Sequence, residues 1–137
     1  MRFMILVKAS PQSERGEMAK QELFDEMAEY HEALAKAGVL VDGSGLQPSS
    51  KGWRITWKDG EKSITDGPFA ETKELVAGYT LIETKTREEA EEWARRFPNP
   101  GVDGLNGEIE IRQLFELDDF EGVDVDRFRE MEAKLRE

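Results

Sequence analysis

The stretch WRITWKDGEKSITD, residues 53–66, has the pattern of a β-hairpin and is the clearest structural signal in the chain. Apolar residues alternate with polar ones from Trp53 to Trp57, and Asp59-Gly60 is a strong signal for a two-residue turn. The turn also sets the register of the two strands, in which Trp53 faces Asp66. The sequence therefore predicts a hairpin with a single acid, Asp66, on its tryptophan face.

The segments on either side of the hairpin predict two helices and four further strands. Upstream, the pattern favours a strand at 3–7, a loop at 12–19, a helix at 20–37 and a strand from 39 that the glycines of 42–45 interrupt. Downstream, it favours a turn at 65–68, a loop at 69–77, a strand at 79–84, a helix opened by a capping box at 86–89, and a strand at 109–117. This order predicts an α+β fold, a ferredoxin-like split βαβ with an inserted β-hairpin.

Length and composition place the chain among single-domain proteins. It has 137 residues, no cysteine, one histidine and a net charge of -11. We divide it into a domain at 1–117 and an acidic helical extension of that domain at 118–137. The charge argues against nucleic-acid binding, and no apolar run is long enough to span a membrane. The N-terminus reads as a strand rather than a signal peptide, so a cytoplasmic location is expected.

The stretches GSGLQPSSKG at 43–52 and TDGPFAETKELVAGY at 65–79 resemble the YCII-related proteins, in their DGPF-domain branch. YHEALAKAGVLVDG at 30–43, EEWARRFPNP at 91–100 and GEIEIRQLFE at 107–116 fit the same family. The resemblance covers residues 1–117 and implies a homodimer in which two ferredoxin-like sheets form a dimeric α+β barrel. It also implies a bacterial, cytoplasmic protein of unknown function, in a family some of whose members accompany extracytoplasmic-function sigma factors.

Asp66 and His31 are the candidate catalytic residues. A carboxylate beside Trp53 would lose hydration and could serve as a general acid or base, although Asp-Gly-Pro is also ordinary turn chemistry. Histidine changes charge near neutral pH, although a lone histidine is often structural. The resemblance points to a histidine-aspartate pair, which has been proposed as an active site in the narrower group of YciI-type proteins. Asp66 matches its aspartate, whereas His31 falls about one helical turn after the expected position of its histidine.

The candidate ligand-binding residues surround the DGPF segment. They are Trp53, Phe69, Glu71, Lys73 and Tyr79. The aromatic residues would line a mostly apolar pocket, or else form core or dimer interface. Lys73 and Glu71 would hold or protonate a substrate, or else form ion pairs in a solvated loop. No metal site and no bound cofactor are expected.

Two functions stay open at this point. One is a small-molecule enzyme that uses acid-base chemistry at Asp66; the other is a non-catalytic ligand-binding or regulatory module, associated with sigma-factor transcription control. We also expect a homodimer, because residues such as Ile109, Ile111, Phe115, Met4 and Leu6 would leave one sheet face apolar and uncovered.

Overall fold

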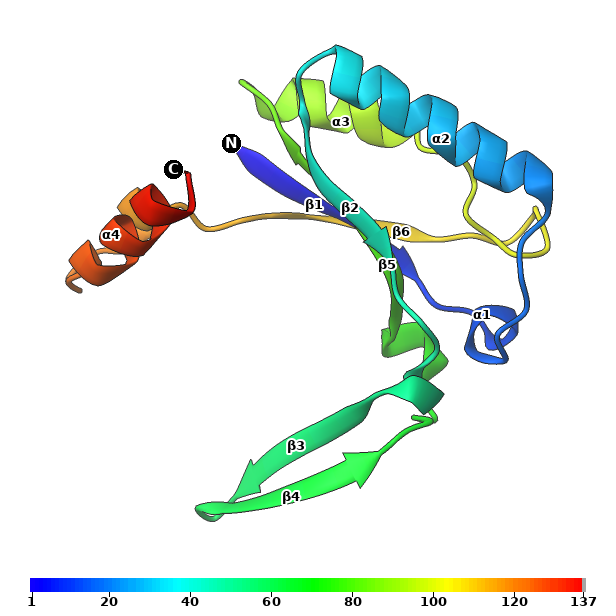
Figure 1. The fold of residues 1–137 in the computed structure, drawn as a ribbon, viewed down its shortest axis with the longest axis horizontal. Coiled ribbons are helices and arrows are strands. Elements are labelled where there is room, and N and C mark those ends of the chain that lie inside the picture. Colours follow the sequence, from blue (N-terminus) through cyan, green and yellow to red (C-terminus); the bar gives the residue numbers. More distant parts are fainter. Residues whose placement is uncertain (137) are drawn as a thin grey trace.

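The computed structural model describes residues 1–136 and shows a four-stranded antiparallel sheet with a separate hairpin (Figure 1). The sheet has the order β2-β5-β1-β6 and the hairpin is β3-β4. The strands are β1 (Arg2–Lys8), β2 (Leu40–Gly45), β3 (Trp53–Lys58), β4 (Glu61–Asp66), β5 (Val76–Glu83) and β6 (Ile109–Gln113). The helices are α1 (Pro11–Glu14), α2 (Gln21–Lys36), α3 (Arg87–Arg95) and α4 (Asp126–Leu135), with short 3-10 turns at Ser49–Lys51, Thr72–Glu74 and Leu117–Asp119.

This strand order confirms the ferredoxin-like α+β fold with an inserted hairpin. The antiparallel neighbours β1 and β5 occupy the centre of the sheet, and α2 and α3 follow β1 and β5 in the chain. Both helices lie on one face of the sheet (Figure 1). The described chain forms an open sheet, and no closed barrel is present within this single subunit.

The core lies between this face and the two helices. Phe3 and Ile5 of β1, Leu34 of α2, Ile82 of β5 and Ala90 of α3 are all buried there. Met4 and Leu6 alternate with Phe3 and Ile5, so their side chains point to the opposite face, where they are only half-buried. The sheet therefore has one helix-covered face and one face that this subunit leaves open.

The hairpin has the register expected from its turn. Trp53 pairs with Asp66 and Lys58 with Glu61. Asp59 and Gly60 have φ values of 51° and 81°, the backbone conformation that a two-residue hairpin turn requires. The hairpin projects away from the four-stranded sheet (Figure 1).

The strand boundaries differ from those expected from the sequence. The glycine-rich segment 42–45 does not interrupt β2, which pairs with β5 as far as Gly45 and shifts register before Asp42. β5 begins at Val76 rather than Tyr79, and β6 ends at Gln113. Ile109 and Ile111 pair with Val7 and Ile5, so they lie on the helix-covered face and not on the open one.

One short helix was not expected. Residues 11–14 form α1, where the sequence predicted only a break at Ser10-Pro11 and a loop at 12–19. Ser10 and Ser13 cap this turn reciprocally, and Pro11 occupies its first position, where a missing N–H costs nothing.

The predicted ends of the longer helices are confirmed at two points. Gly38 follows α2 with a φ of +77°, as expected of a C-terminal cap. Thr86 accepts a hydrogen bond from the Glu89 N–H at 3.2 Å and so caps α3. The Glu89 carboxylate accepts from the Lys85 N–H instead of the Thr86 N–H, so only half of a capping box forms.

The base of the hairpin is held by the loop that precedes it. The Ser49 hydroxyl accepts from the Phe69 N–H at 3.0 Å and donates to the Glu14 carboxylate at 2.5 Å. The Ser49 N–H also donates to Glu14. Gly67 packs so closely on Ser49 that a Cβ there would lie 2.6 Å from the Ser49 carbonyl carbon. The Gly-Pro-Phe part of the DGPF segment therefore makes the joint between hairpin and domain.

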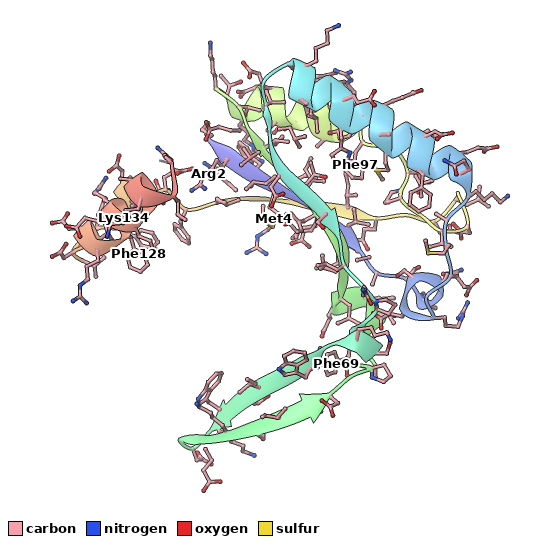
Figure 2. The ribbon with its side chains drawn as sticks, in the orientation of Figure 1. Arg2, Met4, Phe69, Phe97, Phe128 and Lys134 are labelled. Atoms are coloured by element: carbon pink, nitrogen blue, oxygen red, sulfur yellow. The ribbon has the colours of Figure 1, made fainter. Side chains whose placement is uncertain are left out.

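The C-terminal stretch forms α4, within the helical extension expected at 118–137. Apolar side chains of α4 stay largely exposed in this subunit: Phe128 is 55%, Met131 50% and Leu135 81% exposed. The segment before α4 is tied to β1 by Arg2, whose guanidinium donates two hydrogen bonds to Glu116 at 3.0 and 3.1 Å. This hydrogen bonding lowers the pKa of Glu116. Figure 2 shows Phe128 on α4, far from the hairpin.

Across residues 1–136, none of the helices combines the length and the apolar character that crossing a membrane would demand.

Candidate functional site

A cavity of about 480 Å³ lies between α2 and the helix-covered face of the sheet. Its apolar wall comes from Val7, Phe24, Met27, Ala28, Ala77, Phe97, Pro100 and Val102. His31 of α2 and Thr80 of β5 face each other at this cavity, and their Nε2 and Oγ1 atoms are 2.8 Å apart. No Asp, Glu, Lys or Arg is among its lining residues, all of which lie in the described part of the chain.

The hydrogen bonds of His31 determine which ring nitrogen carries a proton. Nδ1 lies 2.7 Å from the Met27 carbonyl oxygen, which can only accept, so Nδ1 carries hydrogen. In the neutral ring Nε2 then accepts from the Thr80 hydroxyl, and in the protonated ring it donates to the same oxygen. Thr80 can therefore serve either charge state of His31, while Nε2 remains the ring nitrogen that can exchange a proton at the cavity.

Space beside Nε2 depends on a glycine. A Cβ at Gly43 of β2 would lie 3.5 Å from Nε2 of His31, which is ordinary contact distance. Any larger side chain at this position would extend into the cavity. The glycine-rich segment of β2 thus allows both strand pairing and an open wall next to His31.

The aromatic rings of Tyr30 and Phe97 lie close to His31. Phe97 lies edge-on to His31 at 6.4 Å and to Tyr30 at 5.1 Å between ring centroids. Figure 2 shows Phe97 beneath α2. Tyr30 is buried and donates to the Trp93 carbonyl at 2.7 Å, and burial raises its pKa to about 12. Tyr30 is therefore a structural neighbour of the cavity and no proton donor near neutral pH.

The structure does not bring Asp66 and His31 together within one subunit. Asp66 ends β4 on the exposed hairpin and does not line the cavity of His31. Trp53, its cross-strand partner, is 65% exposed. The acid-base role of Asp66 stays a prediction with no support from the geometry of a single chain.

The other predicted binding residues are also spread out. Phe69 lies at the hairpin base, with the Arg54 guanidinium carbon 3.7 Å from its ring centroid. Glu71 and Lys73 are exposed, and Lys73 lines a smaller cavity of about 250 Å³ near Ser10 and Pro11. Tyr79 contributes to the His31 cavity, but strand alternation directs its side chain to the opposite face from Thr80. There its hydroxyl donates to Asp42 at 2.8 Å, which raises the pKa of Tyr79.

Sequence reasoning missed Thr80, Met27 and Phe97. A threonine at a buried strand position is a weak signal on its own. Thr80 can be recognised as a candidate site residue only from the packing of α2 over β5, which places it against His31. Met27 and Phe97 were recognised only as members of apolar stripes, which is the ordinary role of such residues.

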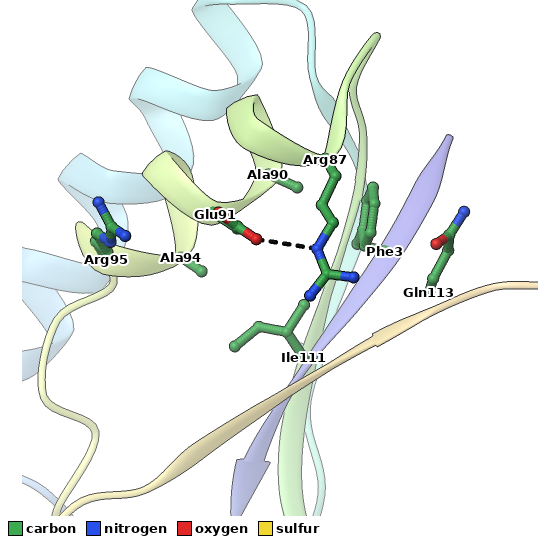
Figure 3. A pocket seen from close by; sticks show the side chains of 8 residues that line it. All are labelled: Phe3, Arg87, Ala90, Glu91, Ala94, Arg95, Ile111 and Gln113. Carbon is green, nitrogen blue, oxygen red and sulfur yellow. Dashed lines mark hydrogen bonds and ion pairs between the residues drawn. The ribbon is translucent and has the colours of Figure 1, made fainter.

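A second groove, of about 330 Å³, lies between α3 and the edge strand β6 (Figure 3). Phe3, Ala90 and Ile111 line its apolar part. Arg87 lies over the groove and its Nε donates to Glu91 at 2.9 Å. None of the predicted site residues lines this groove, whereas His31 and Tyr79 line the first cavity, so the His31 cavity is the better candidate.

Within residues 1–136, no three His, Cys, Asp or Glu side chains gather closely enough to hold a metal ion.

The chain belongs to the YCII-related domain family, whose model matches residues 1–118, and the resemblance found in its motifs is thereby confirmed. One curated relative is the uncharacterized protein R00369 of Rhizobium meliloti (strain 1021), which is 35% identical over 79 residues. That match covers 58% of this chain and 62% of the relative, so it spans less than two-thirds of the relative's length.

A solved structure with a similar outline is 5-chloro-2-hydroxyhydroquinone dehydrochlorinase (TftG) from Burkholderia phenoliruptrix AC1100, in complex with 2,5-dihydroxybenzoquinone. The two chains are 11% identical, with a TM-score of 0.44, over 87% of this chain and 98% of that one.

Proposed function

We propose that this protein binds a small, uncharged and largely apolar molecule in the His31 cavity, through one hydrogen-bonding group that meets His31 and Thr80. The observation that carries the proposal is the hydrogen-bonded pair of His31 and Thr80 in a mainly apolar wall. The other hydroxyl groups among the lining residues, those of Ser13, Ser44 and Tyr79, donate to other partners. Binding sites for small molecules have this composition, and a volume of about 480 Å³ lies within their usual range.

The chemistry of the wall narrows the ligand class. Because the lining has no fixed charge other than a protonated His31, a strongly ionic ligand would be left without a partner inside the cavity. Phe24 and Phe97 present aromatic surface, which suits a flat ring. A ring that carries one hydroxyl group matches both features, since that hydroxyl can donate to Nε2 while the Thr80 hydroxyl turns to donate to the ligand oxygen.

Phenol is a suitable probe, with benzene as its apolar counterpart. We expect phenol to bind the wild-type protein about fivefold more tightly than benzene, the worth of one neutral hydrogen bond. The double variant His31→Phe with Thr80→Val keeps the approximate shapes but removes the ring nitrogens and the hydroxyl, so this preference should disappear. Glu32→Gln changes the exposed neighbour on α2 and should retain the preference. Titrations followed by backbone amide shifts measure all six affinities. Equal affinity for both probes in the wild type would contradict the proposal.

A second candidate function, acid-base catalysis at His31, rests on the orientation of its ring. The Met27 carbonyl holds Nδ1–H, and Nε2 faces a hydroxyl that accepts or donates. This is the arrangement a general base or acid needs at a substrate. Asp66 would join such a site only if another subunit brought it to the cavity. The alternative of a regulatory module that only senses its ligand uses the same cavity without proton transfer.

The protein acts as a homodimer in this proposal. The open face of the sheet carries Met4, Leu6 and Leu81 at its centre, with charged residues such as Lys8 and Glu110 around them. The hairpin also carries exposed apolar side chains. Together with the open sheet face, they form an apolar surface that a partner subunit would cover.

A further inference from the structure

The β3–β4 hairpin has one apolar face and one polar face. The cross-strand pairs place Trp53, Ile55 and Trp57 of β3 on the same face as Asp66, Ile64 and Lys62 of β4. The Lys62 ammonium lies 5.7 Å from the Trp57 ring centroid, which confirms that these two side chains share a face. The remaining pairs, such as Lys58 with Glu61, form a polar face.

The apolar face is left largely exposed by residues 1–136 of its own subunit. Trp53 is 65%, Ile55 44%, Trp57 63% and Ile64 69% exposed. A two-stranded ribbon of this kind is marginally stable in water by itself, because half of its side chains should be packed. Figure 1 shows the hairpin away from α2, α3 and α4, so none of these helices covers it.

The charges at the two ends of this face identify a suitable occupant. Asp66 lies at the base of the hairpin, beside Trp53, and Lys62 lies toward the tip, beside Trp57. Ile55 and Ile64 pair with each other between them. A two-fold axis through this isoleucine pair would bring Lys62 of one copy against Asp66 of the other, and each Trp53 against a Trp57. The face is therefore complementary to itself in an antiparallel arrangement.

We propose that the hairpins of two copies of this chain pack face to face, with Lys62 of each copy paired to the partner subunit's Asp66. This inference rests on the homodimer proposed above and names one of its contacts. It assigns Asp66 a role at the dimer interface. At this interface, four apolar side chains of each copy become buried and lose their contact with water. The two ion pairs at the rim set the antiparallel register.

Charge exchange tests this arrangement. Lys62→Glu places two acids opposite each other in a homodimer, and Asp66→Lys places two bases opposite each other. Each variant should raise the dimer dissociation constant about tenfold or more at low ionic strength, because like charges then meet twice per dimer. An equimolar mixture of the two variants should recover wild-type affinity, since both contacts again join opposite charges. Sedimentation equilibrium measures each constant.

Matched controls separate this contact from general effects of charge or folding. Lys58→Glu makes the same charge change on the polar face and should leave the dissociation constant unchanged. Circular dichroism and thermal melting establish that each variant is folded, and Trp57→Ala should also weaken the dimer without altering any charge.

Three outcomes would overturn the inference, and they have different meanings. A wild-type dimer that neither charge variant weakens must form through another surface, such as the open sheet face, and the homodimer proposal would survive. Weakening by both variants without recovery in the mixture would show that the hairpin docks on a different segment, such as α4. A wild-type chain that stays monomeric at tens of micromolar would refute the homodimer as well.

Discussion

Gly67→Ala is expected to lower the free energy of unfolding by about 3 kcal/mol, the upper part of the range for overpacking. The new Cβ would lie 2.6 Å from the Ser49 carbonyl carbon and closer still to its oxygen, and backbone atoms cannot rotate away. The Gly67 N–H also donates to the Gly52 carbonyl at 3.0 Å, so any shift strains a second contact. Urea denaturation followed by tryptophan fluorescence measures this loss, since Trp53 and Trp57 lie on the hairpin and Trp93 lies in α3.

Gly52→Ala is the matched control, because its Cβ would lie 3.6 Å from the same Ser49 oxygen. This is an ordinary contact, and the extended backbone of Gly52 accepts any side chain, so we expect a change within about 0.5 kcal/mol. Equal stabilities of the two variants would show that the DGPF joint is loose and that Gly67 has no packing role.

Leu34→Ala should cost about 2–5 kcal/mol, as expected for a fully buried leucine. Leu34 has no exposed surface and packs in the core between α2 and the sheet, so truncation leaves a cavity that the surrounding strands can fill only in part. Leu105→Ala, at a side chain that is 77% exposed, removes the same atoms from a loop and should cost less than about 0.5 kcal/mol. Similar losses in the two variants would contradict the placement of α2 on the sheet. Urea denaturation followed by circular dichroism measures both.

Local patterns in the sequence were sufficient to predict the hairpin and the two long helices. Asp59-Gly60 determines both the turn and the register that places Asp66 beside Trp53, and the Gly38 cap predicts where α2 ends. These features depend on neighbouring residues only, so no knowledge of tertiary packing was needed. The order of the elements was then enough to predict the ferredoxin-like topology.

Features that depend on long-range packing could not be predicted in the same way. β2 continues through its glycines because β5 pairs with it, although glycine is unfavourable in a strand interior. The sequence pattern placed Ile109 and Ile111 on the open face of the sheet. The pairing register of β1 and β6 places them on the core side instead. The contact between His31 and Thr80 joins residues 49 positions apart, and no local pattern encodes it.

The DGPF segment lies at the joint and on the surface of the hairpin, apart from the His31 cavity of the same subunit. Its glycine packs on Ser49, its Phe69 N–H donates to the same residue, and Asp66 sits on the exposed face of the hairpin. Gly67 and Phe69 attach the hairpin to the rest of the domain, and Asp66 belongs to the exposed surface of the hairpin. The polar pair at the cavity is His31 and Thr80. Thr80 belongs to β5, the strand that follows the DGPF segment in the chain.

The most direct test of the ligand site is the position of bound phenol. Nuclear Overhauser effects between phenol ring protons and ¹³C-labelled side chains report which residues lie in contact with it. We expect them to reach the Met27 methyl group and the His31 imidazole, both of which line the cavity. Effects confined to the exposed Trp53 and Trp57 of the hairpin, with none at Met27 or His31, would contradict the assignment of the cavity as the binding site.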